Sequence, residues 1–309
     1  MNSNTIGIWG TAAGVAEFLS VQKALHGEKK VRYAESWQEL TPEENTGEDS
    51  NCFGRIYAFP AKAEYASLPC FFESLSSWPR YEVYVCADCG LPLPADQKAE
   101  IEGTVFFRFS FCRMNLVQRM LKRFFDLVCG GVGLLVLSPV LLLCAVLVKM
   151  GSKGPVFYSQ ERIGKGGKPF RIYKFRSMRT DAEAEGPCLS SSGDPRITAW
   201  GNIMRRYRLD EIPQLWNAVK GDMAVVGYRP ERAYFIERIV EKAPYYTLLY
   251  ALKPGITSSG ITTFGYAENV PQMIVRLSCD MAYMERLSLK EDLRILGRTC
   301  RVIVYGVGK

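Results

Sequence analysis

The sequence predicts a mixed α/β protein in which a small α/β domain precedes a helix-rich, monotopic membrane domain. The chain of 309 residues is 48% hydrophobic and 23% charged, which excludes a disordered chain and allows two domains. Residues 1–112 carry a net charge of −6, whereas residues 113–309 carry +13. Residues 127–148 contain no charged side chain. We therefore expect a domain boundary between residues 112 and 113, and a membrane segment in the basic second domain.

The first domain is expected to be Rossmann-like. Residues 6–10, 30–34 and 82–85 read as strands, and a helix is expected over residues 11–25. Gly7, Gly10 and Gly14 approximate the dinucleotide fingerprint without matching it, and Glu35 follows the second strand at the position of a ribose-binding acid. We predict a structural strand–turn–helix unit, with nucleotide binding as the alternative.

Composition excludes several classes of active site. His26 is the only histidine, so catalytic triads and histidine-rich metal sites would all depend on it. The ten cysteines include one CxxC pair, Cys86 and Cys89, without the second pair that a structural zinc site needs. The first ten residues lack the basic and apolar regions of a signal peptide. We expect reduced thiols in a cytosolic setting.

The uncharged run favours a helix that enters the membrane and returns. Ser138 and Pro139 lie at its middle, where proline removes a backbone hydrogen bond and bends a helix. Both flanks are basic, and a crossing helix would place only one flank on the cytoplasmic side. The prediction is a re-entrant helix over about residues 124–148; a single crossing and a buried core helix are the alternatives.

A basic stretch follows the membrane segment. Residues 149–179 contain nine Lys or Arg and one acid, Glu161. They suit anionic lipid headgroups, a phosphorylated substrate, or both. Strands are expected over residues 155–159 and 169–175, joined by a glycine-rich turn. Lys174 then lies among apolar neighbours and needs an anionic partner.

Two adjacent carboxylates, Asp210 and Glu211, form the strongest candidate for chemistry. Pro213 fits only in the first turn of a helix, which places both acids at that helix's N-terminus. Apolar residues with helical spacing follow at Ile212, Leu215, Trp216 and Val219. Arg205, Arg206 and Arg208 precede the acids, so Asp210 is expected to stay ionised as a nucleophile or magnesium ligand. The alternative is a helix cap with surface ion pairs.

Eight blocks of sequence together carry a family resemblance. The blocks are residues 122–126, 138–139, 154–178, 194–198, 209–217, 220–227, 253–257 and 287–293. In this order they resemble the bacterial sugar transferases, also called monotopic phosphoglycosyl transferases, and the resemblance extends over residues 119–305.

The resemblance implies a reaction and a set of residues. Asp210 would attack the β-phosphorus of a UDP-sugar, expel UMP and form a phosphosugar-aspartyl intermediate that polyprenyl phosphate then accepts. Mg²⁺ would assist, held by Asp210 and Glu211, and Glu211 would place the metal or deprotonate the lipid phosphate. The cations implied to face the substrate phosphates are Lys174, Arg205 and Arg229, and further residues implied near the site are Asp292 and Arg176.

The implied partners are a UDP-sugar, an undecaprenyl-type phosphate and membrane lipids, but no nucleic acid; homo-oligomerisation is left open. The implied location is the cytoplasmic face of the bacterial inner membrane, at the first membrane step of exopolysaccharide, capsule or other glycan assembly.

One departure from the family pattern concerns residues 258–266, where an arginine of that pattern is missing. Two alternatives follow: an inactive membrane-anchored module that recruits partners, and an NAD-linked sugar-modifying enzyme.

The C-terminal region predicts an amphipathic helix. Ser288 and Glu291 have the spacing of a capping box. The apolar positions are Leu289, Leu293, Leu296, Cys300 and Ile303. Packing of this stripe against the core is the simpler interpretation, and contact with the membrane surface is the alternative.

Overall fold

The computed structural model divides into two compact units. The first joins Met1–Arg113 with Val240–Ala251, and the second joins Met114–Ile239 with Leu252–Lys309. The described residues are 5–10, 30–34, 36–40, 55–60, 67–76, 80–86, 98–101, 104–184, 186–191 and 193–306. The expected helix over residues 11–25, together with His26, Glu35 and Cys89, lies outside them.

The first unit is built on a six-stranded sheet with strand order β2-β1-β3-β4-β6-β5. The pairs from β2 to β4 are parallel, and β6 pairs antiparallel with both β4 and β5. Three of these strands coincide with strands predicted from the sequence. The elements are β1 (Thr5–Gly10), β2 (Lys30–Ala34), η1 (Trp37–Leu40), β3 (Arg55–Phe59), α2 (Leu68–Ser76), β4 (Arg80–Cys86), β5 (Lys98–Ile101) and β6 (Thr104–Cys112).

Gly10 has a packing role at the end of β1. Its φ is +151°, and a Cβ built there would lie 2.5 Å from the Cβ of Phe59 on β3. Only glycine allows this approach of the two strands. The structural interpretation of the glycine pattern therefore accounts for Gly10 without a nucleotide.

A segment from late in the chain completes the core of this unit. η7 (Pro244–Ala251) is buried along its whole length. The ring of Tyr245 packs against Phe109 of β6 with centroids 5.3 Å apart, and Thr247 Oγ1 donates a hydrogen bond to the Pro69 carbonyl at 3.1 Å. The boundary predicted from charge alone assigned this segment to the second domain, because the segment carries no charge that distinguishes it.

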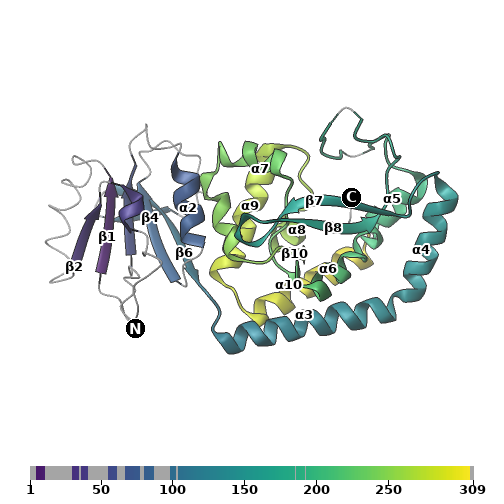
Figure 1. Ribbon diagram of the computed structural model, residues 1–309, viewed down its shortest axis with the longest axis horizontal. Coiled ribbons are helices and arrows are strands. Elements are labelled where there is room, and N and C mark those ends of the chain that lie inside the picture. The colour runs from purple at the N-terminus through teal and green to yellow at the C-terminus, as the bar shows by residue number, and fades with distance from the viewer. Residues whose placement is uncertain are drawn as a thin grey trace. The chain divides into compact units, whose positions relative to one another are not determined.

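The second unit combines helices with two two-stranded sheets. β7 and β8 form an antiparallel hairpin, and β9 and β10 form a parallel pair (Figure 1). The elements are α3 (Leu116–Val136), α4 (Ser138–Gly151), β7 (Phe157–Ile163), η5 (Lys165–Gly167), β8 (Pro169–Phe175), α5 (Ala199–Arg206), η6 (Leu209–Glu211), α6 (Gln214–Lys220), β9 (Ala224–Val226), α7 (Ala233–Val240), β10 (Gly255–Thr257), α8 (Ser259–Thr263), α9 (Val270–Glu285) and α10 (Leu289–Val304).

α3 and α4 form a bent pair. α3 ends at Val136, α4 begins at Ser138 with Pro139 in its first turn, and the axes differ by 61°. Ser138 Oγ donates to the Leu135 carbonyl at 2.7 Å and so satisfies a group that the break releases. Among the described helices, none alone is long and apolar enough to cross a membrane, whereas this pair together is. The break lies where the sequence predicts it.

The outward side of this pair is apolar. Side chains that are 40% or more exposed include residues from both ends of α3 and from the middle of α4, a pattern that a water-facing helix avoids. They are Leu116, Val117, Met120, Leu121, Phe124, Leu127, Val128, Val132, Leu135, Val136, Leu142, Leu143, Val146 and Met150.

The inward side of α3 carries the charged side chains of residues 122–126, whereas Arg119 is exposed. Arg123 donates to the carbonyls of Ala218 and Val219 at 2.6 and 2.7 Å, and Asp126 accepts from the Val225 backbone N–H at 2.8 Å. One turn further, a Cβ at Gly130 would lie 2.9 Å from the Val219 side chain, so α6 approaches α3 closely there. The charged block at residues 122–126 thus attaches α3 to the rest of the unit.

The burial pattern of α10 contradicts the expectation that its apolar stripe packs against the core. The helix starts as predicted, with Ser288 Oγ accepting from the Glu291 N–H at 3.2 Å. The side chains that face the core, however, are Asp292 and Ile295, while Leu293 is 60% exposed. The prediction that the apolar stripe packs against the core is wrong, because a buried carboxylate takes that position.

Candidate functional site

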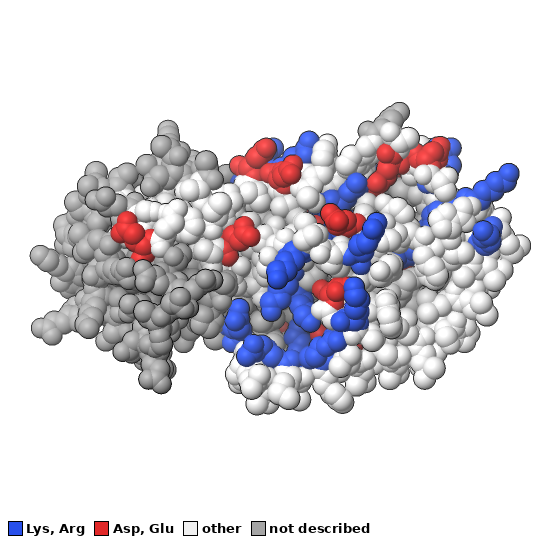
Figure 2. Space-filling view, viewed as in Figure 1, with Lys and Arg blue, Asp and Glu red and all other residues white. Residues whose placement is uncertain are grey.

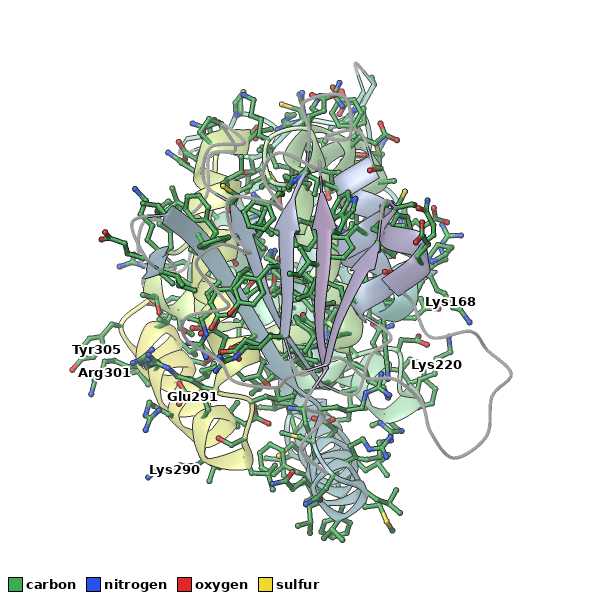
Figure 3. All side chains as sticks on the ribbon, turned by 90° about the vertical axis from the view of Figure 1, so that its left-hand side faces the viewer. Lys168, Lys220, Lys290, Glu291, Arg301 and Tyr305 are labelled. Carbon is green, nitrogen blue, oxygen red and sulfur yellow. The ribbon has the colours of Figure 1, made fainter. Side chains whose placement is uncertain are left out.

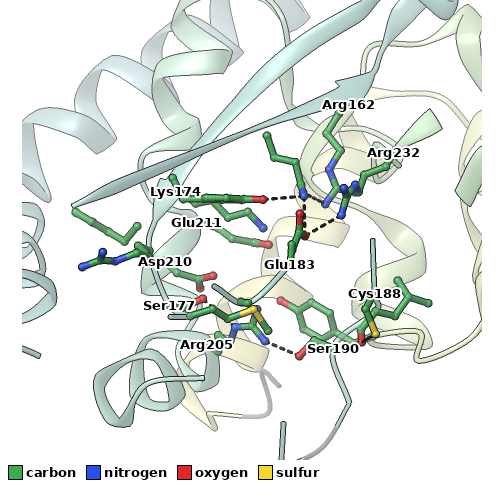
Figure 4. Close-up of a pocket in the computed structure, with 18 of the residues that line it drawn as sticks. Arg162, Lys174, Ser177, Glu183, Cys188, Ser190, Arg205, Asp210, Glu211 and Arg232 are labelled. Carbon is green, nitrogen blue, oxygen red and sulfur yellow. Dashed lines mark hydrogen bonds and ion pairs between the residues drawn. The ribbon is translucent and has the colours of Figure 1, made fainter. Parts of the chain in front are cut away.

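The second unit encloses a pocket of about 340 Å³ that contains most of the predicted site residues. Asp210, Glu211, Lys174, Arg205 and Arg229 all line it, and so does Arg176. Figure 4 shows Lys174, Asp210 and Glu211 together on one wall. The sequence therefore selected residues that folding brings into one cavity.

The two acids lie just before α6 and not in its first turn. They belong to η6, a 3₁₀ turn, and Pro213 is the N-cap residue of α6. Arg208, immediately before that turn, has a φ of +57°. It is the only non-glycine residue with positive φ in the described part of the chain, and such backbone strain concentrates at functional sites. The left-handed residue begins the tight turn that places both carboxylates on the pocket wall.

Glu211 is fully engaged by two arginines. It forms a buried ion pair with Arg208, and both terminal nitrogens of Arg229 lie 3.2 Å from its Oε1. These guanidinium groups overcome the effect of burial and hold the pKa of Glu211 well below its usual range. A carboxylate with such a low pKa is a poor general base but a strong anchor for cations.

Asp210 differs from its neighbour. Its Oδ1 is buried and accepts no hydrogen bond from any residue that the structure describes. Burial, and next the charge of Glu211, raise the pKa of Asp210, whereas Lys174, Arg205 and Arg208 lower it. The sequence predicted the lowering by cations but not the larger opposing effect of burial. A buried carboxylate oxygen without a partner among the described residues is available to a water, a cation or an electrophile in the pocket.

Lys174 reaches the acids because β8 is fixed to α6. Asn217 is completely buried; its Oδ1 accepts from the Tyr173 N–H at 3.1 Å, and its Nδ2 donates to the Arg171 carbonyl at 2.7 Å. These two hydrogen bonds set the position of the next residue, Lys174, on the pocket wall. Burial, together with the Arg162 guanidinium, lowers the pKa of Lys174 to about 8.

Arg205 and Arg176 have different environments. Arg205 donates from Nε to Ser177 Oγ at 3.0 Å and from Nη1 to Ser190 Oγ at 2.6 Å, which orients its guanidinium at the pocket (Figure 4). Arg176 instead donates to the carbonyls of Ser152 and Lys153 at 2.8 and 2.7 Å. Arg176 thus lines the pocket and also holds the segment that follows α4 in place.

Asp292 lies elsewhere. It is absent from the pocket wall and completely buried, with Lys122 Nζ 2.5 Å from its Oδ2 and Tyr283 donating to its Oδ1 at 2.6 Å. Lys122 also donates to the Val226 carbonyl at 3.0 Å. The acid implied to lie near the site thus joins α3, β9, α9 and α10 in a single charged network.

The other end of the pocket contains residues that the sequence analysis missed. Glu231 forms ion pairs with Arg276 and, at 3.2 Å, with Arg162, and Glu183 lies 2.8 Å from Arg232 (Figure 4). Tyr266 also lines the cavity. These residues are dispersed from position 162 to position 276, so no local spacing could have grouped them.

A magnesium ion is compatible with this donor set. No cluster of three or more acidic, cysteine or histidine side chains that could hold a metal occurs among the described residues. Mg²⁺, however, commonly uses one or two protein carboxylates together with substrate phosphates. The carboxylate of Asp210, whose Oδ1 accepts no hydrogen bond from the described residues, could contribute to such a site together with the adjacent Glu211.

Comparison with known proteins is consistent with this geometry. The profile of the bacterial sugar transferases matches residues 117–306. A UDP-N-acetylgalactosamine-undecaprenyl-phosphate N-acetylgalactosaminephosphotransferase of Aeromonas hydrophila is 36% identical over 192 residues, which is 62% of this chain and 45% of the relative.

Two further relatives share a different name. UDP-glucose:undecaprenyl-phosphate glucose-1-phosphate transferases of Escherichia coli and Caulobacter vibrioides are 37% and 36% identical over 182 residues, or 58% of this chain. The matched region is 39% of the Escherichia protein and 67% of the Caulobacter protein. The chain thus spans less than half the length of the Aeromonas and Escherichia relatives.

Replacing Asp292 with alanine is expected to destabilise the fold. The substitution leaves the Lys122 ammonium, whose side chain is 16% exposed, without its anionic partner, and breaking a buried pair typically costs about 3–5 kcal/mol. The measurement is the thermal unfolding midpoint. The double variant Lys122→Met with Asp292→Leu should recover most of the loss, and Asp181→Ala, at an exposed ion pair, should change little.

An unchanged midpoint in Asp292→Ala combined with lost activity would contradict this structural role. It would support the near-site role implied by the resemblance.

Proposed function

Because the chain belongs to the bacterial sugar transferase family, we propose that it transfers a sugar 1-phosphate from a UDP-sugar to polyprenyl phosphate, with release of UMP. One observation carries the proposal: the buried Oδ1 of Asp210, which has no partner among the described residues, lies in a cavity lined by Lys174, Arg205 and Arg229. A single carboxylate oxygen surrounded by cations suits attack on a phosphate whose own negative charges would otherwise repel it.

In the first step Asp210 Oδ1 attacks the β-phosphorus of the donor. A bond forms between this oxygen and phosphorus, and the bond from the β-phosphorus to the bridging oxygen breaks. The electron pair leaves with UMP, and the sugar phosphate stays on Asp210 as an acyl phosphate. Lys174, Arg205 and Arg229 bind the phosphate oxygens and offset their charge.

In the second step an oxygen of polyprenyl phosphate attacks the same phosphorus. The acyl phosphate bond breaks, Asp210 is regenerated as a carboxylate, and a polyprenyl diphosphate sugar forms. Glu211 keeps Arg208 and Arg229 oriented through both steps, a role that fits its depressed pKa better than proton abstraction does.

Mg²⁺, held by Asp210 and Glu211 together with the donor phosphates, would supply additional positive charge at the reacting phosphate. The two acids would provide its protein oxygens, Asp210 through the oxygen that is not the attacking Oδ1. The cations of the pocket wall complete the neutralisation.

The lipid substrate requires a site at the membrane, and we place the α3–α4 pair there as a re-entrant, monotopic anchor. Figure 2 shows the surface over α4 as uncharged, with basic side chains at its border. In Figure 3, Lys168 and Lys220 project on one side of the unit, and Lys290 and Arg301 on the other. Cations that flank an apolar surface suit the anionic cytoplasmic face of the inner membrane.

Replacing Asp210 with asparagine tests whether Asp210 is the nucleophile. Asp210→Asn should lower UMP release from UDP-sugars, in the presence of polyprenyl phosphate and Mg²⁺, by about a thousandfold or more, because the amide cannot form the acyl phosphate. Without lipid phosphate, mass spectrometry should detect one sugar phosphate on the wild-type chain and none on the variant.

Asp181→Asn is the matched control for this substitution, since Asp181 is an exposed acid that should leave the rate unchanged. UMP release by Asp210→Asn at the wild-type rate would refute the nucleophile. Absence of UMP release from the folded wild type in lipid, with every donor, would favour the inactive module.

Binding of UDP should weaken as pH rises through about 8. Lys174 has a pKa of about 8, so its ammonium is present below that pH and is lost above it, and with it a charged contact to phosphate. Titration of UDP without Mg²⁺ should show about a tenfold fall in affinity between pH 7 and pH 9.5. Lys174→Arg should abolish this fall, because arginine stays charged; an identical pH profile in both proteins would contradict the assignment.

The re-entrant arrangement predicts that both ends of the α3–α4 pair face the same side. Single cysteines introduced as Arg113→Cys and Lys153→Cys, in a chain whose ten native cysteines are replaced, should react with an impermeant maleimide only from the cytoplasmic side. Retained UMP release verifies folding of each variant. Labelling from opposite sides would establish a crossing helix.

A further inference from the structure

The segment at which this chain departs from the family pattern places an aromatic side chain in the pocket. Tyr266 follows α8, and its ring centroid lies 5.4 Å from the Arg229 guanidinium carbon and 5.7 Å from that of Arg208. Both arginines are the partners of Glu211. The ring is therefore in contact with the charge cluster beside the attacking carboxylate.

Hydrogen bonds fix the position of this segment. Asp280, buried on α9, accepts from the Gly260 N–H at 2.7 Å and from the Arg229 N–H at 3.3 Å. A Cβ at Gly260 would lie 2.6 Å from the Arg276 side chain, so only glycine fits. One carboxylate thus sets the position of the loop that leads to Tyr266 relative to the backbone of Arg229.

The hydroxyl of Tyr266 has no hydrogen-bond partner among the residues that the structure describes, although the residue lines the pocket. Burial, and next the charge of Glu211, raise the pKa of Tyr266, so the hydroxyl remains a neutral donor and acceptor. Tyrosine hydroxyls in partly buried positions normally find a partner. A bound substrate can supply that partner.

The chemistry of the donor indicates which part of it meets the phenol. The phosphates are matched by Lys174, Arg205 and Arg229, so a neutral phenol adds little there. The relatives named above share uridine diphosphate but differ in the sugar, N-acetylgalactosamine or glucose. A side chain from a segment that departs from the family pattern suits the part of the donor that varies.

Building on the proposed function, we propose that Tyr266 is a specificity-determining residue whose hydroxyl forms a hydrogen bond with the sugar of the donor. Its ring meanwhile packs against Arg208 and Arg229 and keeps the sugar next to the phosphate that Asp210 attacks. Loss of the hydroxyl should therefore weaken binding of the sugar without weakening binding of the nucleotide.

The experiment compares UDP-sugars with UDP in the catalytically blocked background Asp210→Asn. Titration calorimetry first identifies the tightest donor among UDP-N-acetylgalactosamine, UDP-N-acetylglucosamine, UDP-glucose and UDP-galactose. Adding Tyr266→Phe, which keeps the ring, should weaken that donor about tenfold and leave the affinity for UDP unchanged. Tyr234→Phe, at a tyrosine outside the pocket, is the matched control and should change neither affinity.

Equal weakening of UDP and UDP-sugar would overturn the assignment to the sugar, and so would no change in either. Failure of the proposed function has a different signature. In that case the chain with Asp210 intact releases no UMP from a donor that it binds. Absence of binding by every donor would reject both proposals.

Discussion

The attachment of α3 to α6 is the constraint on which the second unit depends. α3 presents an apolar surface outward and would not stay on a water-soluble core through hydrophobic contact alone. Charge and hydrogen bonding hold it instead: Lys122 pairs with buried Asp292, Arg123 binds the last carbonyls of α6, and Asp126 accepts from β9. Because α6 starts shortly after η6, which carries Asp210, the same contacts fix the distance between the Asp210 carboxylate and the helix that we place in the membrane. In the proposed reaction, a lipid phosphate held at headgroup level would then meet a carboxylate whose depth is set by the fold.

The adjacent acids Asp210 and Glu211 have different surroundings and therefore suit different roles. Glu211 has two guanidinium partners and a depressed pKa, whereas the Oδ1 of Asp210 has no described partner and its pKa is raised. Two neighbouring carboxylates in one buried site would repel each other, and Arg208 and Arg229 reduce this repulsion by pairing with Glu211. Glu211 therefore holds the two arginines in place, and Asp210 remains available for the proposed reaction. The left-handed backbone at Arg208 belongs to the same arrangement, because it turns the chain so that this arginine meets the glutamate three residues later.

Sequence reasoning succeeded where the chemistry is local. The break at Ser138 and Pro139 follows from proline geometry, and the pairing of Arg208 with Glu211 follows from adjacency along the chain. It failed where a polar side chain replaces an apolar one inside the fold. On α10 the completely buried residues are Asp292 and Ile295, and on α6 they are Asn217 and Ala218 while Trp216 is 54% exposed. The apolar stripes therefore missed the buried polar position on each helix, although Leu215 and Val219 of the α6 stripe do pack against α3. Hydrophobic periodicity assumes that burial and apolarity coincide, and a protein with an apolar outer surface and buried charge networks departs from that assumption. Contacts such as Glu231 with Arg276, or η7 with β6, join positions too distant in sequence for any spacing to reveal.

The buried polar residues also explain how three distant segments form one site. Asn217 binds the backbone of β8 and thereby positions Lys174; Asp280 binds both the loop that leads to Tyr266 and the backbone of Arg229; Glu211 binds Arg229 through its side chain. Each link uses hydrogen bonds, which specify direction, where hydrophobic packing would specify only proximity. Arg229 is thus held twice, through its backbone by α9 and through its side chain by Glu211, the acid next to Asp210. A shift of the loop that carries Tyr266 would therefore move the Asp280 link and with it Arg229. If the two proposals hold, recognition of the sugar and neutralisation of the reacting phosphate are connected through a single buried carboxylate, Asp280.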